Sequence, residues 1–446
     1  MTEKDRKTYK KMYEDTICSP YISYIERIKT LKAIKTAIQG NIELVSEALS
    51  SDLNKHKNEA YFSEIGLVLK ELSLTISQLK KWMKPKRAKT PILLFGGSSK
   101  LIPQAMGIAL IISPWNYPFY LSLMPIISAI AAGNRVILKP SESSPETSYL
   151  LTNLFNNTVD SRYIYVMSSD VDSTKEMLMN KFDIVFFTGS QRVGSLVRQQ
   201  LCSTNTAIIL ELGGKCPVII DQNLNIDQSV EKVFNSKVIN AGQTCVAPDY
   251  VAIHKDKIDI FIDKFNKLSS EFEKHIDEYP KIINKKHFDR LLNLAKNTEL
   301  TVKDTKILPK AIKTTFNSEL MVDEIFGPLL PVVSYSEISE VLDFIKSNGE
   351  PLATYVFTKS KNFENVIVER VRTGAVVTNE IMLQLANYNL PFGGVGSSGW
   401  GRSHGYQGFL AFSNVVSCYS RWGFGTKLNT HPYTDKKINL IKKFLK

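Results

Sequence analysis

The chain has 446 residues, of which 43% are hydrophobic and 22% charged, so it is globular and long enough for two or three domains. This composition excludes a disordered chain and a small scaffold that depends on disulfides. The formal net charge of +12 comes from lysines spread over the whole chain, without an arginine-rich cluster interleaved with aromatic residues. We therefore expect no nucleic-acid partner.

Two common kinds of site are also excluded by the cysteines and histidines. The five cysteines are odd in number, widely spaced and never arranged as CxxC, and the six histidines are isolated without an HExxH. We expect neither a disulfide framework nor a metal site. The charged stretch MTEKDRKTYKKMYED has no apolar signal region, which favours a reduced cytoplasmic compartment.

The first part of the chain is expected to be helical. Residues 1–85 carry apolar residues at helical spacing, and the following KPKRAKTPILLFGGSSKLIPQ has the prolines and glycines of an extended hairpin or arm. The uncharged stretch Leu101–Asn134 raises the alternative of a membrane span. Because Pro114, Pro118 and Pro125 interrupt it, two buried elements joined by a turn are the better interpretation.

Strands and helices then alternate. The apolar runs AMGIALIIS, NRVILKP, YIYVMS, DIVFFTGS and TAIILEL predict buried strands. Between them lie helical segments, the first of which begins at SSPETSYLLTNLF with Ser144 as N-cap and Pro145 at the first helical position. This alternation predicts a doubly wound, nucleotide-binding parallel sheet over residues 100–211. Residues 212–410 continue with α/β patterning and longer loops.

Three short motifs fall at the predicted ends of strands, where doubly wound sheets bind ligands. Gly189 and Gly194 would permit a tight turn and close packing at a helix that begins on a bound anion. Lys139 and Glu142 in KPSE could hold a ribose, and Glu142 would repel a 2′-phosphate. Glu211 in ELGGK could act as a general base if it is partly buried. Taken singly, each motif fits an ordinary turn as well.

Cys245 lies in NAGQTCVAPDY among small and polar residues. From these residues alone it could be a buried filler, a metal ligand, half of a disulfide or a nucleophile. The motifs SPWNYPF, KPSE, FTGS, LELGGK, NAGQTC, EIFGP and PFGG occur in this order, and together they resemble the NAD(P)-dependent aldehyde dehydrogenase superfamily. The motifs are most similar to those of its class 3 branch, which handles fatty and aromatic aldehydes. The resemblance runs from about residue 20 to about residue 435.

The resemblance implies an α/β, aldehyde-dehydrogenase-like fold. A Rossmann-type doubly wound cofactor domain would comprise 1–85 and 103–211, and an α/β catalytic domain 212–410. A β-arm for oligomerisation and a C-terminal tail would comprise 86–102 and 411–446. Family members of this branch are dimers, so a homodimer is implied here.

The resemblance also implies roles for the site residues. Cys245 matches the nucleophile that forms a thiohemiacetal and then a thioester with a small-molecule aldehyde substrate. Asn116 matches the side-chain donor of the oxyanion hole, and Glu211 the base that activates the hydrolytic water. The cofactor would be NAD, with NADP as an alternative. The matching cofactor-binding positions are Lys139, Glu142, Gly189, Ser190, Val193, Gly194, Glu324, Phe326 and Phe392.

Some residues depart from the usual family wording. Cys216 stands where serine or alanine is common, and Trp400 and Arg402 replace smaller residues near the predicted substrate side, so chain-length preference does not carry over. Alternatives are a CoA-acylating or acyl-reducing relative and a non-catalytic protein of the same fold on a lipid surface. The tail DKKINLIKKFLK has Ile438, Ile441 and Leu445 at helical spacing among five lysines, which fits either weak peripheral membrane contact or packing on the protein.

Overall fold

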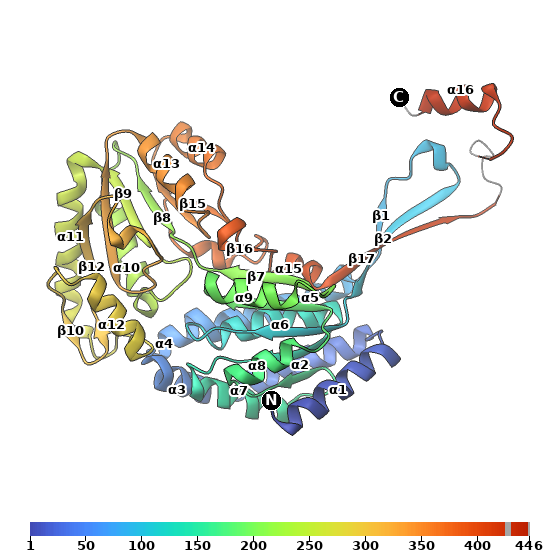
Figure 1. Cartoon of the computed structure of the whole chain (residues 1–446), viewed down its shortest axis with the longest axis horizontal. Coiled ribbons are helices and arrows are strands. Elements are labelled where there is room, and N and C mark those ends of the chain that lie inside the picture. Colours follow the sequence, from blue (N-terminus) through green and yellow to red (C-terminus); the bar gives the residue numbers. More distant parts are fainter. Residues whose placement is uncertain (424–429, 445–446) are drawn as a thin grey trace.

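The computed structural model describes residues 1–423 and 430–444. Within these residues, two six-stranded sheets form the body, and a three-stranded sheet forms an arm that projects away from it (Figure 1). This agrees with the α/β fold expected from the sequence.

The first sheet has the order β16-β7-β6-β3-β4-β5 and is parallel except for the short edge strand β16. Its inner strands are almost wholly buried because helices cover both faces, which explains their continuous apolar runs. The five predicted strands all form. The strands are β3 (Ile108–Ile112), β4 (Arg135–Lys139), β5 (Ile164–Val166), β6 (Ile184–Gly189), β7 (Ala207–Leu212) and β16 (Gly399–Trp400).

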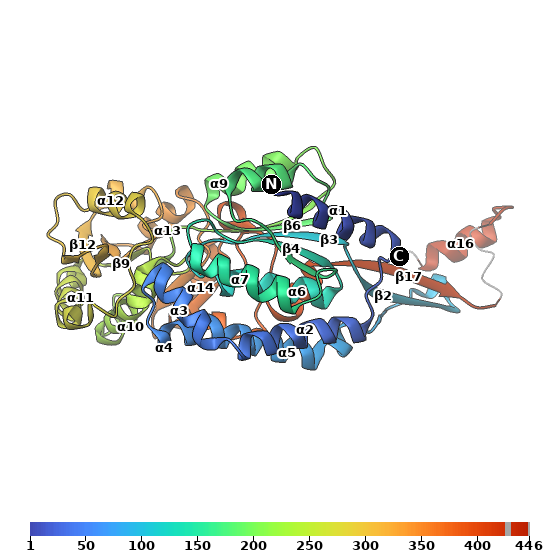
Figure 2. The ribbon, with the colours of Figure 1, turned by 90° about the horizontal axis from the view of Figure 1, so that it is seen from below.

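Successive strand residues point to opposite faces, so each face has its own core. Ala109 and Ile111 of β3 belong to the core on one side, and Ile108 and Leu110 to the core on the other. Figure 2 shows the two helical layers. One layer contains α2 (Tyr24–Gln39), α3 (Ile42–Leu53), α4 (Lys57–Ala60), α5 (Gly66–Trp82), α6 (Tyr120–Ala132), α7 (Pro145–Thr158) and α15 (Gly405–Ala411); the other contains α1 (Glu3–Cys18), α8 (Val171–Leu178) and α9 (Gln191–Leu201).

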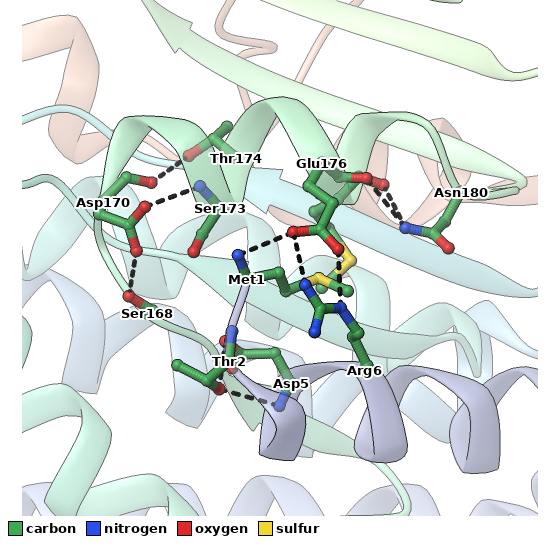
Figure 3. A network of polar contacts seen from close by, with 11 residues as sticks. Met1, Thr2, Asp5, Arg6, Ser168, Asp170, Ser173, Thr174, Glu176 and Asn180 are labelled. Atoms are coloured by element: carbon green, nitrogen blue, oxygen red, sulfur yellow. Dashed lines mark hydrogen bonds and ion pairs between the residues drawn. The ribbon is translucent and has the colours of Figure 1, made fainter.

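Polar contacts dock α1 onto α8 (Figure 3). Thr2 and Asp5 form a capping box at the start of α1, and Asp170 caps α8 by accepting from the Ser173 N–H at 2.7 Å. The Arg6 guanidinium donates to Glu176 at 2.7 Å and lowers the pKa of that carboxyl to about 2. The pair is exposed, so it contributes little to stability and mainly sets the position of α1.

The second sheet is wholly parallel, with the order β12-β13-β9-β8-β14-β15. Its strands are β8 (Pro217–Ile220), β9 (Tyr250–His254), β12 (Lys310–Thr314), β13 (Leu329–Tyr335), β14 (Thr354–Phe357) and β15 (Val376–Thr378). The helices around it are α10 (Asp227–Val238), α11 (Ile258–Phe272), α12 (Lys285–Leu294), α13 (Ile338–Ser347) and α14 (Lys361–Arg370), with a small hairpin of β10 (Val302–Lys303) and β11 (Lys306–Ile307).

The arm is built from the predicted hairpin and a later strand. β1 (Lys86–Ala88) and β2 (Gly97–Ala105) are antiparallel, and β17 (Ser413–Arg421) pairs with β2 along its whole length (Figure 1). The predicted tail forms α16 (Asp435–Phe444), which packs against the turn Ile92–Leu94 at the tip of the hairpin. Leu445 of the expected apolar stripe lies outside the described residues.

Two expectations from the sequence need adjustment. β16 pairs with β7, and α15 packs on α6, so residues 399–411 return to the first sheet, although we assigned residues 399–410 to the catalytic domain. Ser144 is the N-cap of α7, but its side chain caps nothing; the carboxylate of Asp52 accepts from the first N–H groups instead. The uncharged stretch forms the end of β2, β3 and α6, as expected, and among the described residues no helix is long and apolar enough to cross a bilayer.

Candidate active site

The segment before Cys245 makes an unusual turn. Asn240, Ala241 and Gly242 all have left-handed backbone conformations, with φ of 51°, 52° and 68°. A Cβ at Gly242 would lie 2.3 Å from the carbonyl oxygen of Gly327, so only glycine fits there. Left-handed conformations cost Asn and Ala about 1–2 kcal/mol per residue, so the surrounding contacts must hold this turn.

Cys245 itself is half-buried at the end of this turn. Burial raises the pKa of its thiol, and the nearby carboxyls of Glu324 and Glu211 raise it further. Behind it, the buried Cys216 thiol donates to the Cys245 carbonyl oxygen at 3.3 Å and its sulfur accepts from the Ala353 N–H. Cys216, which departs from the usual family motif, therefore supports the backbone of the candidate nucleophile.

Asn116 lies in the loop after β3 and is directly bonded to the Cys245 segment. Its side-chain amide donates to the Gln243 carbonyl at 3.0 Å, and its own carbonyl accepts from the Asn240 amide at 2.8 Å. Next to these bonds, the hydroxyls of Tyr117 and Thr244 lie 2.7 Å apart. Loops from the two sheets are thus joined at the point where the sequence placed a nucleophile and an oxyanion donor.

Glu211 is the next-to-last residue of β7 and is buried at the same site. Its Oε1 accepts from the Ser403 hydroxyl at 3.3 Å, whereas its buried Oε2 has no partner. Burial raises the pKa of Glu211 to about 8, and Ser403 and the charge of Arg402 only partly oppose this rise. A carboxyl with such a pKa takes up and releases a proton near neutral pH, as a general base requires.

Lys139 and Glu142 lie together at the carboxyl end of β4. The Lys139 ammonium is buried and lies 2.6 Å from the half-exposed Glu142 carboxylate. This leaves a carboxylate at the surface, held by one cation, at the edge of the sheet where ligands bind. Both residues therefore lie where the sequence predicted a ribose.

The start of α9 is where the sequence predicted a bound anion. Ser190 is the N-cap, and its hydroxyl accepts from the Val193 N–H at 3.4 Å. Gly194 packs closely, as expected, because a Cβ there would lie 2.6 Å from Leu212. A Cβ at Gly189 would lie 2.7 Å from the Phe187 ring, so this glycine is required by packing and not by a left-handed turn.

Glu324 and Phe326 approach from the second sheet. The Glu324 carboxyl lies over Gly213, where a Cβ would be 2.0 Å from Oε2. Phe326 has a left-handed φ of 45° and packs edge-on against the Trp115 ring. The buried Asp249 fixes this loop, because it accepts from the Ile325 N–H at 2.7 Å. To the start of α9, the half-exposed Glu142 carboxylate and the Phe326 ring, the sequence assigns contacts with a dinucleotide, and that assignment stays a prediction.

Phe392 forms another wall and is fixed by two bridging backbone bonds to Ser403. Its ring stacks on buried His404 with centroids 5.0 Å apart. Burial lowers the pKa of His404 to about 4, so the ring is neutral. Trp400 is 71% exposed, and Arg402 donates to the carbonyls of Gly394 and Gly401.

Sequence reasoning missed the residues that hold the site together. Ser403 bonds to the candidate base, and Glu59 accepts from the Asn240 N–H at 2.8 Å. Lys55 and Glu64 form a wholly buried ion pair of 2.5 Å that contacts the Asn116 loop. The only local sign of the pair is that charged residues interrupt a helical apolar pattern, and such residues normally face solvent.

The chain is similar to known proteins over most of its length. Residues 20–418 match the protein family described as "Aldehyde dehydrogenase family". The chain is 37% identical over 434 residues to 4,4'-diaponeurosporen-aldehyde dehydrogenase of Staphylococcus aureus, covering 94% of both chains. It is 36% identical to aldehyde dehydrogenase family 3 member H1 of Arabidopsis thaliana, covering 94% of this chain and 90% of that one. The solved substrate-bound state of Staphylococcus aureus AldH superposes with a TM-score of 0.95 at 36% identity, over 100% of both chains.

Proposed function

We propose, from the premise that this chain belongs to the aldehyde dehydrogenase family and is an NAD(P)-dependent enzyme, that it oxidises medium- and long-chain aliphatic or aromatic aldehydes to carboxylic acids. The observation that carries the proposal is the direct bonding of the Asn116 loop to the Cys245 segment, with Glu211 buried beside them. The three residues supply a nucleophile, an oxyanion donor and a base in one place.

In the first step, the Cys245 sulfur, as thiolate, bonds to the aldehyde carbon, and the carbonyl electron pair moves to the oxygen. The Asn116 amide and the Cys245 N–H stabilise the oxyanion, and such donors are each typically worth about 3–4 kcal/mol. Because burial and two carboxyls raise the pKa of the free thiol, Cys245 must lose its proton to a base. We assign this role to Glu211, one of those two carboxyls, which then passes the proton to solvent and is free to act again.

A nicotinamide cofactor, when bound, would supply the acceptor for the hydride that leaves the aldehyde carbon. The carbon then remains attached to Cys245 as a thioester. Glu211 takes a proton from water as the water oxygen bonds to the acyl carbon, and the carbon–sulfur bond breaks to give the carboxylic acid and free Cys245. The buried, weakly bonded Glu211 carboxyl supports this role.

The test is absorbance at 340 nm, where NADH absorbs, with a ladder of aldehydes from short aliphatic to long-chain and aromatic. We expect turnover with acid as product, and an optimum among the medium, long or aromatic members. Adding CoA and measuring acyl-CoA tests the acylating alternative. Acyl-CoA as the main product, or no oxidation of any aldehyde, would overturn the proposed reaction.

Cofactor preference is expected to depend on Glu142. Its carboxylate suits ribose hydroxyls and repels a 2′-phosphate, so kcat/KM should be higher with NAD than with NADP. Glu142→Gln removes the repulsion while keeping an acceptor, and should raise the NADP-to-NAD ratio of kcat/KM about fivefold, since a screened charge pair of this kind is worth about 1 kcal/mol. A wild-type preference for NADP would contradict this expectation.

A homodimer formed through the arm is the expected assembly. β17 is an edge strand, and Leu101, Val415 and Tyr419 on the arm are 39–45% exposed, so a second copy of the chain would cover them. We expect twice the chain mass of 50.3 kDa by light scattering, and a monomer for Val415→Asp. A monomeric wild type would refute the dimer.

We further propose a cytoplasmic protein with weak peripheral contact to anionic membranes through α16. Lys436, Lys442 and Lys443 are exposed on this helix, and Phe95 at the neighbouring arm tip is 77% exposed. Vesicles containing phosphatidylserine should sediment the full chain at low salt but not a variant lacking residues 435–446. Equal sedimentation of the two proteins would remove this proposal.

A further inference from the structure

The turn before Cys245 has one side-chain acceptor for its first N–H group. Glu59, next to the end of α4, accepts from the Asn240 N–H through Oε1 at 2.8 Å. Asn240 begins the run of three left-handed residues, and its own side-chain Oδ1 is buried without a hydrogen bond. The contact joins residues 181 positions apart in the chain. A residue of α4 therefore holds the turn that presents the thiol.

The same short segment also holds the other side of the site. The buried Lys55 ammonium donates to the Asn116 carbonyl at 3.3 Å and pairs with Glu64 at 2.5 Å. The second oxygen of Glu64 accepts from the N–H groups of Phe119 and Tyr120 at 3.0 Å each. Residues 55–64 therefore contact both the loop that carries the oxyanion donor and the turn that carries the nucleophile.

We propose that Glu59 is a positioning residue that fixes the left-handed turn at Asn240 and thereby sets the Cys245 sulfur against the oxyanion donor Asn116. The proposal rests on the proposed function, because the gain from this placement appears only when an oxyanion forms. A displacement of about 1 Å in such a constellation costs on the order of 10²-fold in rate.

Glu59 is suited to mutation because it is half-buried and bonds through a single oxygen. Burial raises the pKa of Glu59, so a neutral acceptor is a fair substitute for its carboxyl. Glu59→Gln keeps the acceptor, whereas Glu59→Ala removes it. Lys57→Ala, in the same helix but exposed, is the matched control. Lys55 is a poorer target, because removing one half of a wholly buried ion pair endangers folding.

The kinetic arm uses the full-length enzyme with NAD and its best aldehyde. Glu59→Ala should lower kcat about 10²-fold while KM for the aldehyde and the dissociation constant of NAD stay within threefold. Glu59→Gln should retain at least a third of wild-type kcat, and Lys57→Ala should match the wild type. A Glu59→Ala enzyme with wild-type kcat, or one in which kcat, KM and NAD affinity deteriorate together, would overturn the positioning role.

The second arm does not need activity. Hydrogen–deuterium exchange is measured on the peptide spanning residues 238–246. Exchange at the backbone N–H of Asn240 should be at least tenfold faster in Glu59→Ala and unchanged in Glu59→Gln. Unchanged exchange in Glu59→Ala would refute the proposal even if the wild type oxidised no aldehyde. If the wild type oxidises no aldehyde but Glu59→Ala still exchanges faster than the wild type, the contact is upheld and only the proposed reaction is rejected.

Discussion

Cys245→Ala is expected to abolish aldehyde oxidation, with a loss of about 10⁴-fold or more in kcat. The neighbouring thiol of Cys216 cannot substitute, because it is wholly buried and donates to the Cys245 backbone. NAD should still bind, since Lys139, Glu142 and the start of α9 do not depend on the sulfur. The measurements are steady-state NADH formation and NAD binding by calorimetry.

Cys202→Ala is the control for this experiment, because Cys202 is an exposed thiol at the end of α9 and should be dispensable. Cys245→Ser tests the chemistry more finely, since it keeps the size of the side chain but supplies a much weaker nucleophile. Appreciable oxidation by Cys245→Ala would show that the reaction does not pass through this thiol.

Glu211→Gln is expected to lower steady-state turnover about 10²–10³-fold, the usual contribution of a general base. If hydrolysis is the step that fails, the thioester accumulates and one equivalent of NADH per site appears in a burst. Glu47→Gln, at an exposed position, is the control. If the variant shows neither the burst nor turnover, the role of Glu211 is to deprotonate the Cys245 thiol. Near-normal turnover would exclude Glu211 from catalysis.

The pH dependence follows from the same carboxyl. With a pKa of about 8, Glu211 is mostly protonated at pH 7, so wild-type turnover limited by hydrolysis should rise up to tenfold per pH unit and level off above about pH 8. Folded protein keeps this proton between pH 4.5 and 8 while the unfolded chain loses it, so the carboxyl's contribution to stability falls over that window. Between pH 4.5 and 8, the free energy of unfolding of Glu211→Gln should therefore rise relative to that of the wild type, by at most about 1.4 kcal/mol per pH unit.

The first sheet was largely predictable from the sequence because each strand is buried on both faces. Runs such as the one at Ile108–Ile112 must then be apolar throughout, and the helices between them begin at recognisable caps such as Ser190. The cap of α7 was only half predictable. Its position is encoded locally by Ser144 and Pro145, but the acceptor is Asp52, which lies far away in the chain.

The candidate site was also only partly predictable from the sequence. Cys245, Asn116 and Glu211 were found because short motifs carry them, and the structure brings their segments together. Their catalytic roles remain predictions. Glu59 and Ser403 were missed because each acts through one long-range hydrogen bond, and nothing in the neighbouring residues marks a glutamate or a serine for such a contact. Pairings of this kind are decided by tertiary packing, which local patterns do not record.

The return of residues 399–411 to the first sheet has a consequence for the order of synthesis. Glu211 receives its hydrogen bond only when Ser403 arrives beside β16. Roughly 160 residues separate Cys245 from Ser403, and a ribosome adds about 5–20 residues per second. A nascent chain therefore contains both Glu211 and Cys245 for about 10–30 s before Ser403 is available to bond to the Glu211 carboxyl. A chain that stops before Ser403 would have both residues but would lack this hydrogen bond, which opposes the rise in the pKa of Glu211.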